Sequence, residues 1–244
     1  MKEMSRARFL KTLLAGAMFL PGAAAFGDAM DKLRGDRVGW SRLKTTSPAW
    51  NRHSNGDPKL TRFFRDQTTL NVDPVWYAAD VENLEEMTKY PFLFSQGVHV
   101  VNDAPGRANA AEYIRRGGFL MVDACCNPTY TPDFDVFLQQ HRGFFAAVLP
   151  ESCFVLLPRT HEVYRCYFQI PNGHPPHTFM SNVYDAKKAA HGLYGVMIGQ
   201  RMAAMVSVSG LQCGWESPTP PPGHDAVCMR MMVNIYIYAM MQGA

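Results

Sequence analysis

Short apolar segments alternate with amphipathic segments along most of the chain beyond residue 37. The apolar segments resemble strands of a sheet that is covered on both faces, and the segments between them repeat apolar residues at helical spacing. The clearest strand, Phe119–Ala124, follows the glycine pair Gly117-Gly118. The other strands predicted here are Val38–Thr46, Val72–Ala78 and Tyr90–Ser95, and the predicted helices are Pro58–Gln67, Val81–Thr88, a helix from Pro105 to the Gly117-Gly118 pair, and Asp133–Phe145.

The second half of the chain departs from this rhythm. Residues 146–191 show no regular alternation, so we expect an irregular excursion there. Asp225 is expected to cap a final helix that ends near Met241. The two strands of a β-hairpin are predicted at Gly192–Ile198 and Met202–Ser209.

Strands that alternate with helices predict βαβ units and a largely parallel sheet. The length of 244 residues and the hydrophobic content of 47% are sufficient for one well-packed domain. We therefore predict a single α/β domain over residues 26–244, in which helices cover both faces of a largely parallel sheet and form a three-layer sandwich.

The N-terminal segment has the features of an export signal. A basic stretch precedes an apolar run over residues 12–25 that is too short to span a bilayer comfortably. Ala23-Ala24-Ala25 offers a cleavage site, so residues 1–25 are predicted to be a signal peptide and the protein is expected to be periplasmic or otherwise exported. Ser5–Lys11 resembles the twin-arginine export motif, although Ala7 replaces the second arginine. An uncleaved signal would instead anchor the chain in the membrane.

Charge excludes one class of partner. Beyond residue 25 the chain has 20 basic and 20 acidic residues and no run of Lys or Arg, which argues against a nucleic-acid groove.

An ordered series of segments resembles the bacterial domain of unknown function 4159 family. The matching segments are Trp50, Thr68–Val72, Tyr90–Phe94, Tyr113–Asp123, His161, Phe168–Pro171, Gly199–Arg201, Gly214–Glu216 and Met229–Ala239. The resemblance implies a class I glutamine amidotransferase-like fold, which is flavodoxin-like, and no established reaction. The chain departs from the family pattern at Ala124, where a second acid is usual, and over Ser209–Cys213, where an Asn and an Asp are usual.

The end of the strand Phe119–Ala124 is the first candidate site. Open α/β sheets bind ligands beyond the carboxyl ends of their strands, so Asp123 either faces a ligand or caps the following turn. In amidotransferases a sharp exit from such a strand exposes a cysteine nucleophile. Cys125 and Cys126 follow Asp123 closely enough to be considered for this role, with a pair of buried thiols as the alternative.

Further candidates come from the segments that carry the resemblance. His161 could act as a general base if Asp123 or Glu216 lay within reach. Trp215 and Glu216 could present an aromatic platform beside a carboxylate, or Trp215 could cover the sheet while Glu216 pairs with Arg201 or Arg230. The candidates for ligand binding are Trp215, Arg201, Arg230 and Asn234.

No metal or cofactor is expected from the sequence. The six cysteines form no C-x-x-C pair, and His174 and His177 lack an evident third ligand.

Three functions remain in view at this stage. The first is a non-catalytic, exported module that binds a small molecule or a component of the cell envelope. The second is a hydrolase or amidotransferase-like enzyme that uses Asp123, His161 and Glu216, or the thiol of Cys125. The third is a structural partner in an assembly of the cell envelope.

Overall fold

A computed structural model describes residues 37–125, 131, 133–175, 192–217 and 222–242. The predicted signal peptide, Cys126 and His177 lie outside these residues. Within the described part of the chain, no helix has the length and apolar character needed to cross a membrane.

The centre of the molecule is a seven-stranded sheet of order β2-β1-β3-β4-β7-β6-β5. The first five of these strands run parallel to one another, whereas β6 is antiparallel to both of its neighbours. The strands are β1 (Val38–Lys44), β2 (Val72–Asp80), β3 (Phe92–Ser95), β4 (Phe119–Asp123), β5 (Ser152–Leu156), β6 (Leu193–Ile198) and β7 (Arg201–Ser207). The fold is therefore the predicted α/β sandwich with a mostly parallel sheet.

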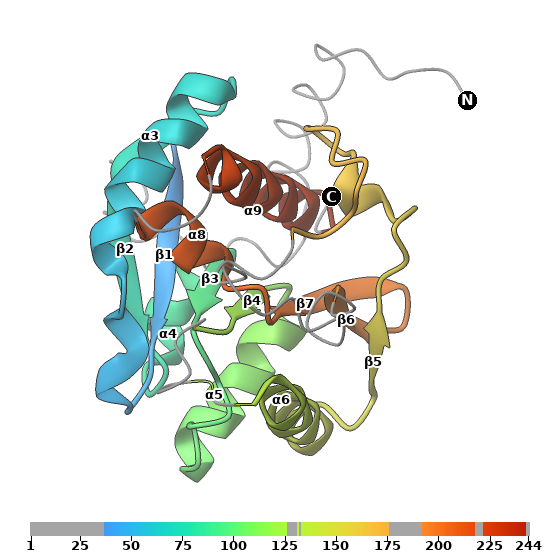
Figure 1. The fold of residues 1–244 in the computed structure, drawn as a ribbon. Helices are drawn as coiled ribbons and strands as arrows, with labels where there is room; N and C mark the ends of the chain where they lie inside the picture. The colour runs from blue at the N-terminus through green and yellow to red at the C-terminus, as the bar shows by residue number, and fades with distance from the viewer. Residues whose placement is uncertain (1–36, 126–130, 132, 176–191, 218–221, 243–244) are drawn as a thin grey trace.

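Helices cover both faces of the sheet, which gives three layers (Figure 1). One face packs against α3 (Asp57–Gln67), α8 (Leu211–Glu216) and α9 (His224–Met241). The other face packs against α4 (Leu84–Thr88), α5 (Ala104–Arg115) and α6 (Phe134–Val148). Three short 3-10 helices, η2 (Pro48–Asn51), η3 (Ser54–Gly56) and η4 (Glu162–Tyr164), lie in the connections.

Strand β4 is central and fully buried, as its sequence predicts. Its side chains alternate between the two cores: Phe119 and Met121 face α9, and Leu120 and Val122 face α5 and α6. Gly118 precedes it because a Cβ at this position would lie 2.4 Å from the Tyr113 ring. Because β4 is the fourth of the seven strands, its carboxyl end lies at the middle of that edge of the sheet.

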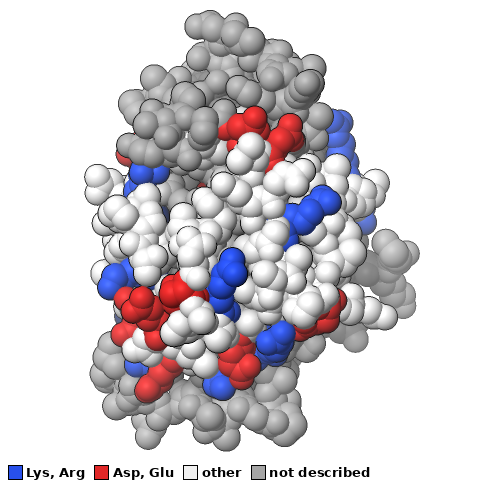
Figure 2. Space-filling model, turned by 90° about the horizontal axis from the view of Figure 1, so that it is seen from below, with Lys and Arg blue, Asp and Glu red and all other residues white. Residues whose placement is uncertain are grey.

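The outer face of α5 and α6 carries charges of both signs. Basic and acidic side chains are interspersed over this surface (Figure 2). Two exposed pairs, Arg115 with Glu151 and Arg116 with Glu112, belong to it.

The structure corrects three predictions in the second half of the chain. Residues 146–191 contain β5, which escaped detection because an edge strand with only partly buried side chains lacks a strong apolar pattern. The six-residue helix α8 was also missed. Asp225 does not cap α9, because Gly223 occupies the N-cap position; Asp225 instead lies in the first turn and pairs with Lys59.

Candidate functional site

The candidate site lies where β4 and β7 end beneath α8. Asp123, the last residue of β4, is paired in register with Ser207, the last residue of β7. After β1 the chain enters a loop that carries η2 and η3, and Gly56 of η3 lies against Trp215 and Glu216 of α8. Between β1 and β3 the order of the strands reverses, and open α/β sheets bind their ligands at such a reversal.

Three side chains form a continuous hydrogen-bonded chain at this place. Cys125 Sγ lies 3.4 Å from His53 Nε2, and His53 Nδ1 lies 3.0 Å from Glu216 Oε2. A neutral imidazole that donates Nδ1–H to the carboxylate has a free lone pair on Nε2 for the thiol proton. The arrangement is that of a nucleophile, a base and a group that orients the base.

The backbone of His53 is held in an uncommon conformation. Its φ is +59°, and no other described residue except glycine has a positive φ. Gln212 Nε2 donates to the His53 carbonyl at 3.1 Å. Gly56 allows α8 to approach, since a Cβ there would lie 2.8 Å from Glu216 Cβ. Strained residues of this kind persist where the surrounding structure fixes them, often at functional sites.

Electrostatics favour the protonated form of His53. The hydrogen bond with Cys125 contributes most to raising the pKa of His53, and the negative charge of Glu216 adds to the rise, while burial opposes it. The side chains of His53 and Glu216 are 26% and 27% exposed, whereas Cys125 as a residue is 3% exposed. The base therefore reaches solvent, and the sulfur lies beneath it.

A second thiol adjoins this chain. Cys213 of α8 places its Sγ 3.9 Å from Cys125 Sγ. The three donor atoms of His53, Cys125 and Cys213 all lie within 4.8 Å of one another.

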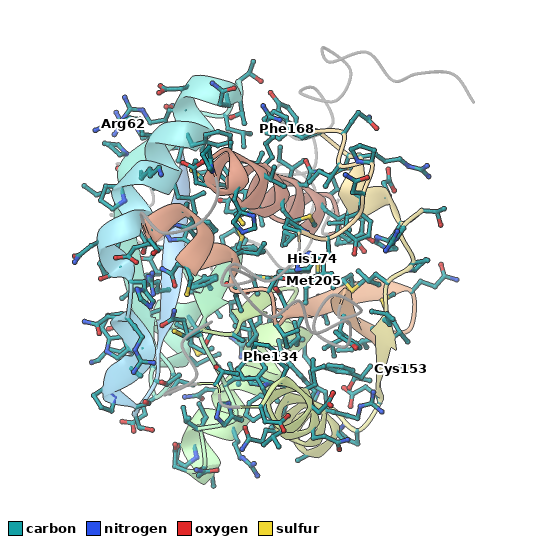
Figure 3. All side chains as sticks on the ribbon, viewed as in Figure 1. Arg62, Phe134, Cys153, Phe168, His174 and Met205 are labelled. Carbon is teal, nitrogen blue, oxygen red and sulfur yellow. The ribbon has the colours of Figure 1, made fainter. Side chains whose placement is uncertain are left out.

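Asp123 lies beside the thiols and is 1% exposed. The Gln212 amide donates to Asp123 Oδ2 at 3.0 Å, and Asp123 Oδ1 accepts no hydrogen bond of normal geometry from the described residues. Burial raises the pKa of Asp123 to about 6, and the hydrogen bond from the Gln212 amide opposes the rise. Next to it, Ser207 Oγ lies 2.9 Å from Nε2 of the partly buried His174, which is labelled in Figure 3.

A buried ion pair supports the floor of the site. Arg42 makes two hydrogen bonds to Asp57, both side chains being fully buried. Asp57 also accepts from Gln212 Nε2 at 3.2 Å. Burial raises the pKa of Asp57 and the Arg42 guanidinium opposes that rise. The pair thus ties β1, α3 and α8 together.

His161, the histidine expected to act as a base, lies elsewhere. Its Nδ1 accepts from Val163 N, and its ring packs edge-on against Tyr238 at 5.3 Å. Among the described residues, no hydrogen bond, ion pair or ring contact joins His161 to Asp123 or Glu216, whose partners are Gln212 and His53 respectively.

The predicted ligand-binding residues are tied to other parts of the fold. Asn234 is buried and bonds to the backbone of Val163 and Phe168, and Arg230 lies over the Phe168 ring at 5.7 Å. Arg201 donates to the Ile114 carbonyl at 2.6 Å.

Trp215 is 1% exposed, so it covers the sheet and offers no open platform. Glu216 pairs with His53 and with neither of the arginines considered for it.

Sequence reasoning therefore found Asp123, Cys125 and Glu216 but missed His53 and Cys213. His53 lies in the polar segment 51–57, which the sequence pattern assigns to a turn, and Cys213 lies in a helix that the pattern does not reveal.

Comparison with known proteins identifies the family of the chain but does not indicate a reaction. No curated protein matches the chain. Residues 40–240 match the model of a family described as a domain of unknown function, DUF4159, and the chain therefore belongs to this family.

Proposed function

We propose that the protein is a thiol-dependent hydrolase or amidotransferase-like enzyme with Cys125 as the nucleophile. The observation that carries the proposal is the unbroken chain from Cys125 Sγ through His53 to Glu216, at 3.4 and 3.0 Å.

The reaction would act on an acyl carbonyl, as in an amide or an ester. The thiol proton passes to His53 Nε2 while Cys125 Sγ bonds to the carbonyl carbon. Collapse of the tetrahedral adduct breaks the bond to the leaving group, which takes the proton from His53. Water, deprotonated by His53, then attacks the thioester, releases the acid and returns the proton to the thiol.

A generic ester tests the proposal without knowledge of the substrate. The reduced protein, kept in a chelator, is incubated with p-nitrophenyl acetate, and the acetylated cysteine is located by mass spectrometry of its peptides. We expect acetylation of Cys125, slowed roughly 10²- to 10⁴-fold in His53→Gln because proton transfer is lost. His161→Ala is the matched control and should leave the rate unchanged.

Two outcomes of this experiment would contradict Cys125 as the nucleophile. Acetylation confined to the exposed Cys153 at the outer edge of the sheet, or a rate at Cys125 that is insensitive to His53→Gln, would remove the nucleophile (Figure 3).

A non-catalytic binding module is the second candidate, and the burial of Cys125 favours it. It predicts no acetylation of Cys125, together with a rise in melting temperature on addition of a fragment of the cell envelope, such as a peptidoglycan muropeptide.

We also propose that residues 1–25 direct export, on the basis of their basic start, apolar run and Ala23-Ala24-Ala25. Fusing the chain to alkaline phosphatase, which is active only after export, tests this. Activity that persists without residues 1–25 would contradict it.

A further inference from the structure

The proposed nucleophile has a neighbour that the thiol reaction does not use. Cys213 is 1% exposed and lies in α8, one turn before Glu216. Its sulfur is 3.9 Å from Cys125 Sγ, and both sulfurs face the imidazole of His53. Two thiols and one imidazole from three separate segments thus converge on one point.

The spacing of these atoms fits a tetrahedral zinc ion. Zn–S bonds of about 2.3 Å and Zn–N bonds of about 2.0 to 2.1 Å place two sulfurs about 3.8 Å apart and a sulfur and a nitrogen about 3.6 Å apart. Here Cys125 Sγ lies 3.9 Å from Cys213 Sγ and 3.4 Å from His53 Nε2, and the donor atoms of Cys213 and His53 lie within 4.8 Å of each other. The three donors therefore already lie near the corners that such an ion requires.

The surroundings also match what a zinc ligand set needs. Glu216 accepts from His53 Nδ1, which orients Nε2 toward the sulfurs and increases its basicity. Two thiolates neutralise a divalent cation, so the loaded centre carries no net charge and can lie in a buried position at low electrostatic cost. Thiolate and imidazole select zinc-like cations over Mg²⁺ and Ca²⁺, which prefer oxygen.

The ligands are held by rigid elements. Cys125 follows the central strand β4, Cys213 is part of α8, and the His53 carbonyl is bonded to Gln212. Donors fixed in this way lose little conformational freedom when an ion binds.

We propose that His53 Nε2, Cys125 Sγ and Cys213 Sγ bind one Zn²⁺ ion, with a water molecule as the fourth ligand. Binding releases the two thiol protons to solvent as the metal–sulfur bonds form. The bound ion occupies the lone pairs of His53 Nε2 and Cys125 Sγ that acyl transfer would use, so the loaded protein has no free thiol nucleophile. The metal site itself stands without the proposed function, and only the blocking of the thiol rests on it.

Metal titration of the reduced full chain, stripped with a chelator, tests the site. Zn²⁺ is added in competition with a chromogenic chelator, and Co²⁺ replaces it to report thiolate ligands and tetrahedral geometry by absorption. We expect one ion per chain, with sulfur-to-cobalt charge-transfer bands. Binding should weaken in Cys213→Ser by more than the roughly 10- to 100-fold expected for loss of an outer partner.

Cys213→Ala provides a second variant, and thermal unfolding of both establishes that they are folded. Cys153→Ser removes an exposed cysteine from β5 and serves as the matched control, with binding like that of the unmodified chain. Binding that is weak, that exceeds one ion per chain, or that is unaffected by both Cys213 variants would overturn the proposal. A rapidly formed Cys125–Cys213 disulfide that resists reduction would overturn it as well.

A protection experiment separates this proposal from the proposed function. Alkylation of Cys125 by iodoacetamide is measured for each variant with and without Zn²⁺, and the ratio of the two rates is compared. We expect strong protection in the unmodified chain and a ratio near one in Cys213→Ser. Failure of zinc binding with intact acetylation of Cys125 refutes only the metal site. Zinc binding without acetylation of the metal-free protein refutes only the thiol enzyme.

Discussion

Two polar regions on the same face of the sheet differ in what their side chains bind. Beside α9, the side chain of Asn234 makes all its described hydrogen bonds to backbone groups, with Val163 O and with Phe168 N and O. Beneath α8, His53 bonds instead to the side chains of Cys125 and Glu216. In the first region the polar group completes the fold, whereas in the second the fold positions reactive groups against one another.

The comparison separates structural from functional polar residues. A buried side chain that satisfies backbone groups stabilises one conformation and has no capacity left for a ligand. Other polar side chains bond to one another and lie beside a group with an unused acceptor, such as Asp123 Oδ1. Such side chains can still bind a proton, an ion or a substrate. We therefore expect substitutions near α9 to lower stability, and those near α8 to change reactivity at a smaller loss of stability.

Asn234→Leu should give the largest effect on stability. The substitution leaves three backbone groups of the 163–168 segment without their partner, at about 1 to 3 kcal/mol for each buried group that stays unpaired. We expect the free energy of unfolding to fall by about 3 kcal/mol or more, measured by urea denaturation.

The rate of Cys125 alkylation in the folded Asn234→Leu variant should not change. A large loss of thiol reactivity with little loss of stability would reverse the assignment of the two regions.

On the opposite face of the sheet, His141 is another buried side chain that bonds to backbone groups. Its Nδ1 donates to Phe137 O at 2.7 Å and its Nε2 accepts from Val98 N at 3.2 Å, with His99 as the facing titratable group. Burial lowers the pKa of His141 to about 3, and the hydrogen bond to Phe137 opposes this. Since the unfolded chain binds the proton from about pH 6.5 downward, the stability due to neutral His141 is lost as the pH falls from 6.5 toward 3.

Between pH 6.5 and 4.5 this group should account for about 2 to 3 kcal/mol of lost stability. His141→Leu should be less stable at neutral pH and should show a flatter dependence on pH over this range. Comparison of the two chains isolates His141, because His174, which has a similarly lowered pKa of about 3, titrates in both. Equal slopes in urea denaturation would show that His141 is not held neutral.

The sequence predicted the part of the site at the end of β4 better than the parts contributed by the η3 loop and by α8. Phe119–Ala124 was evident as a buried strand, so the position of Asp123 and the proximity of Cys125 followed from the rule for parallel sheets. His53 and Cys213 could not be placed, because their meeting with Cys125 depends on where the chain returns to the sheet. A six-residue helix with a glycine, such as α8, shows no periodicity that would reveal it. His161 and Asn234 were chosen from matched segments, and such a match does not distinguish residues that complete the fold from residues that react.

Gly56→Ala tests the close contact that brings α8 to His53. Because φ of Gly56 is −80°, alanine fits the backbone, and the effect comes from its Cβ against Glu216. We expect a loss of about 1 to 2 kcal/mol from overpacking, together with slower alkylation of Cys125. Gly143→Ala in α6 is the matched control: no atom approaches its Cβ, so helix propensity should stabilise the protein by roughly 0.5 to 1 kcal/mol. Equal effects of the two substitutions would mean that the α8 contact is not tight.

Glu216→Gln should change stability least and still alter the site. About a quarter of the Glu216 side chain is exposed, so loss of its charge should lower the free energy of unfolding by less than about 1 kcal/mol. The amide can turn its NH₂ toward His53 Nδ1, which moves the ring proton to Nε2 and directs it at Cys125. We therefore expect zinc affinity to fall roughly 10- to 100-fold and acetylation of Cys125 to slow. Glu151→Gln, which removes a carboxylate from the exposed pair with Arg115, should change stability equally little and leave both readouts unaltered. If the two substitutions cannot be distinguished at Cys125, then Glu216 does not orient the imidazole, and the region beneath α8 would be no more reactive than the one beside α9.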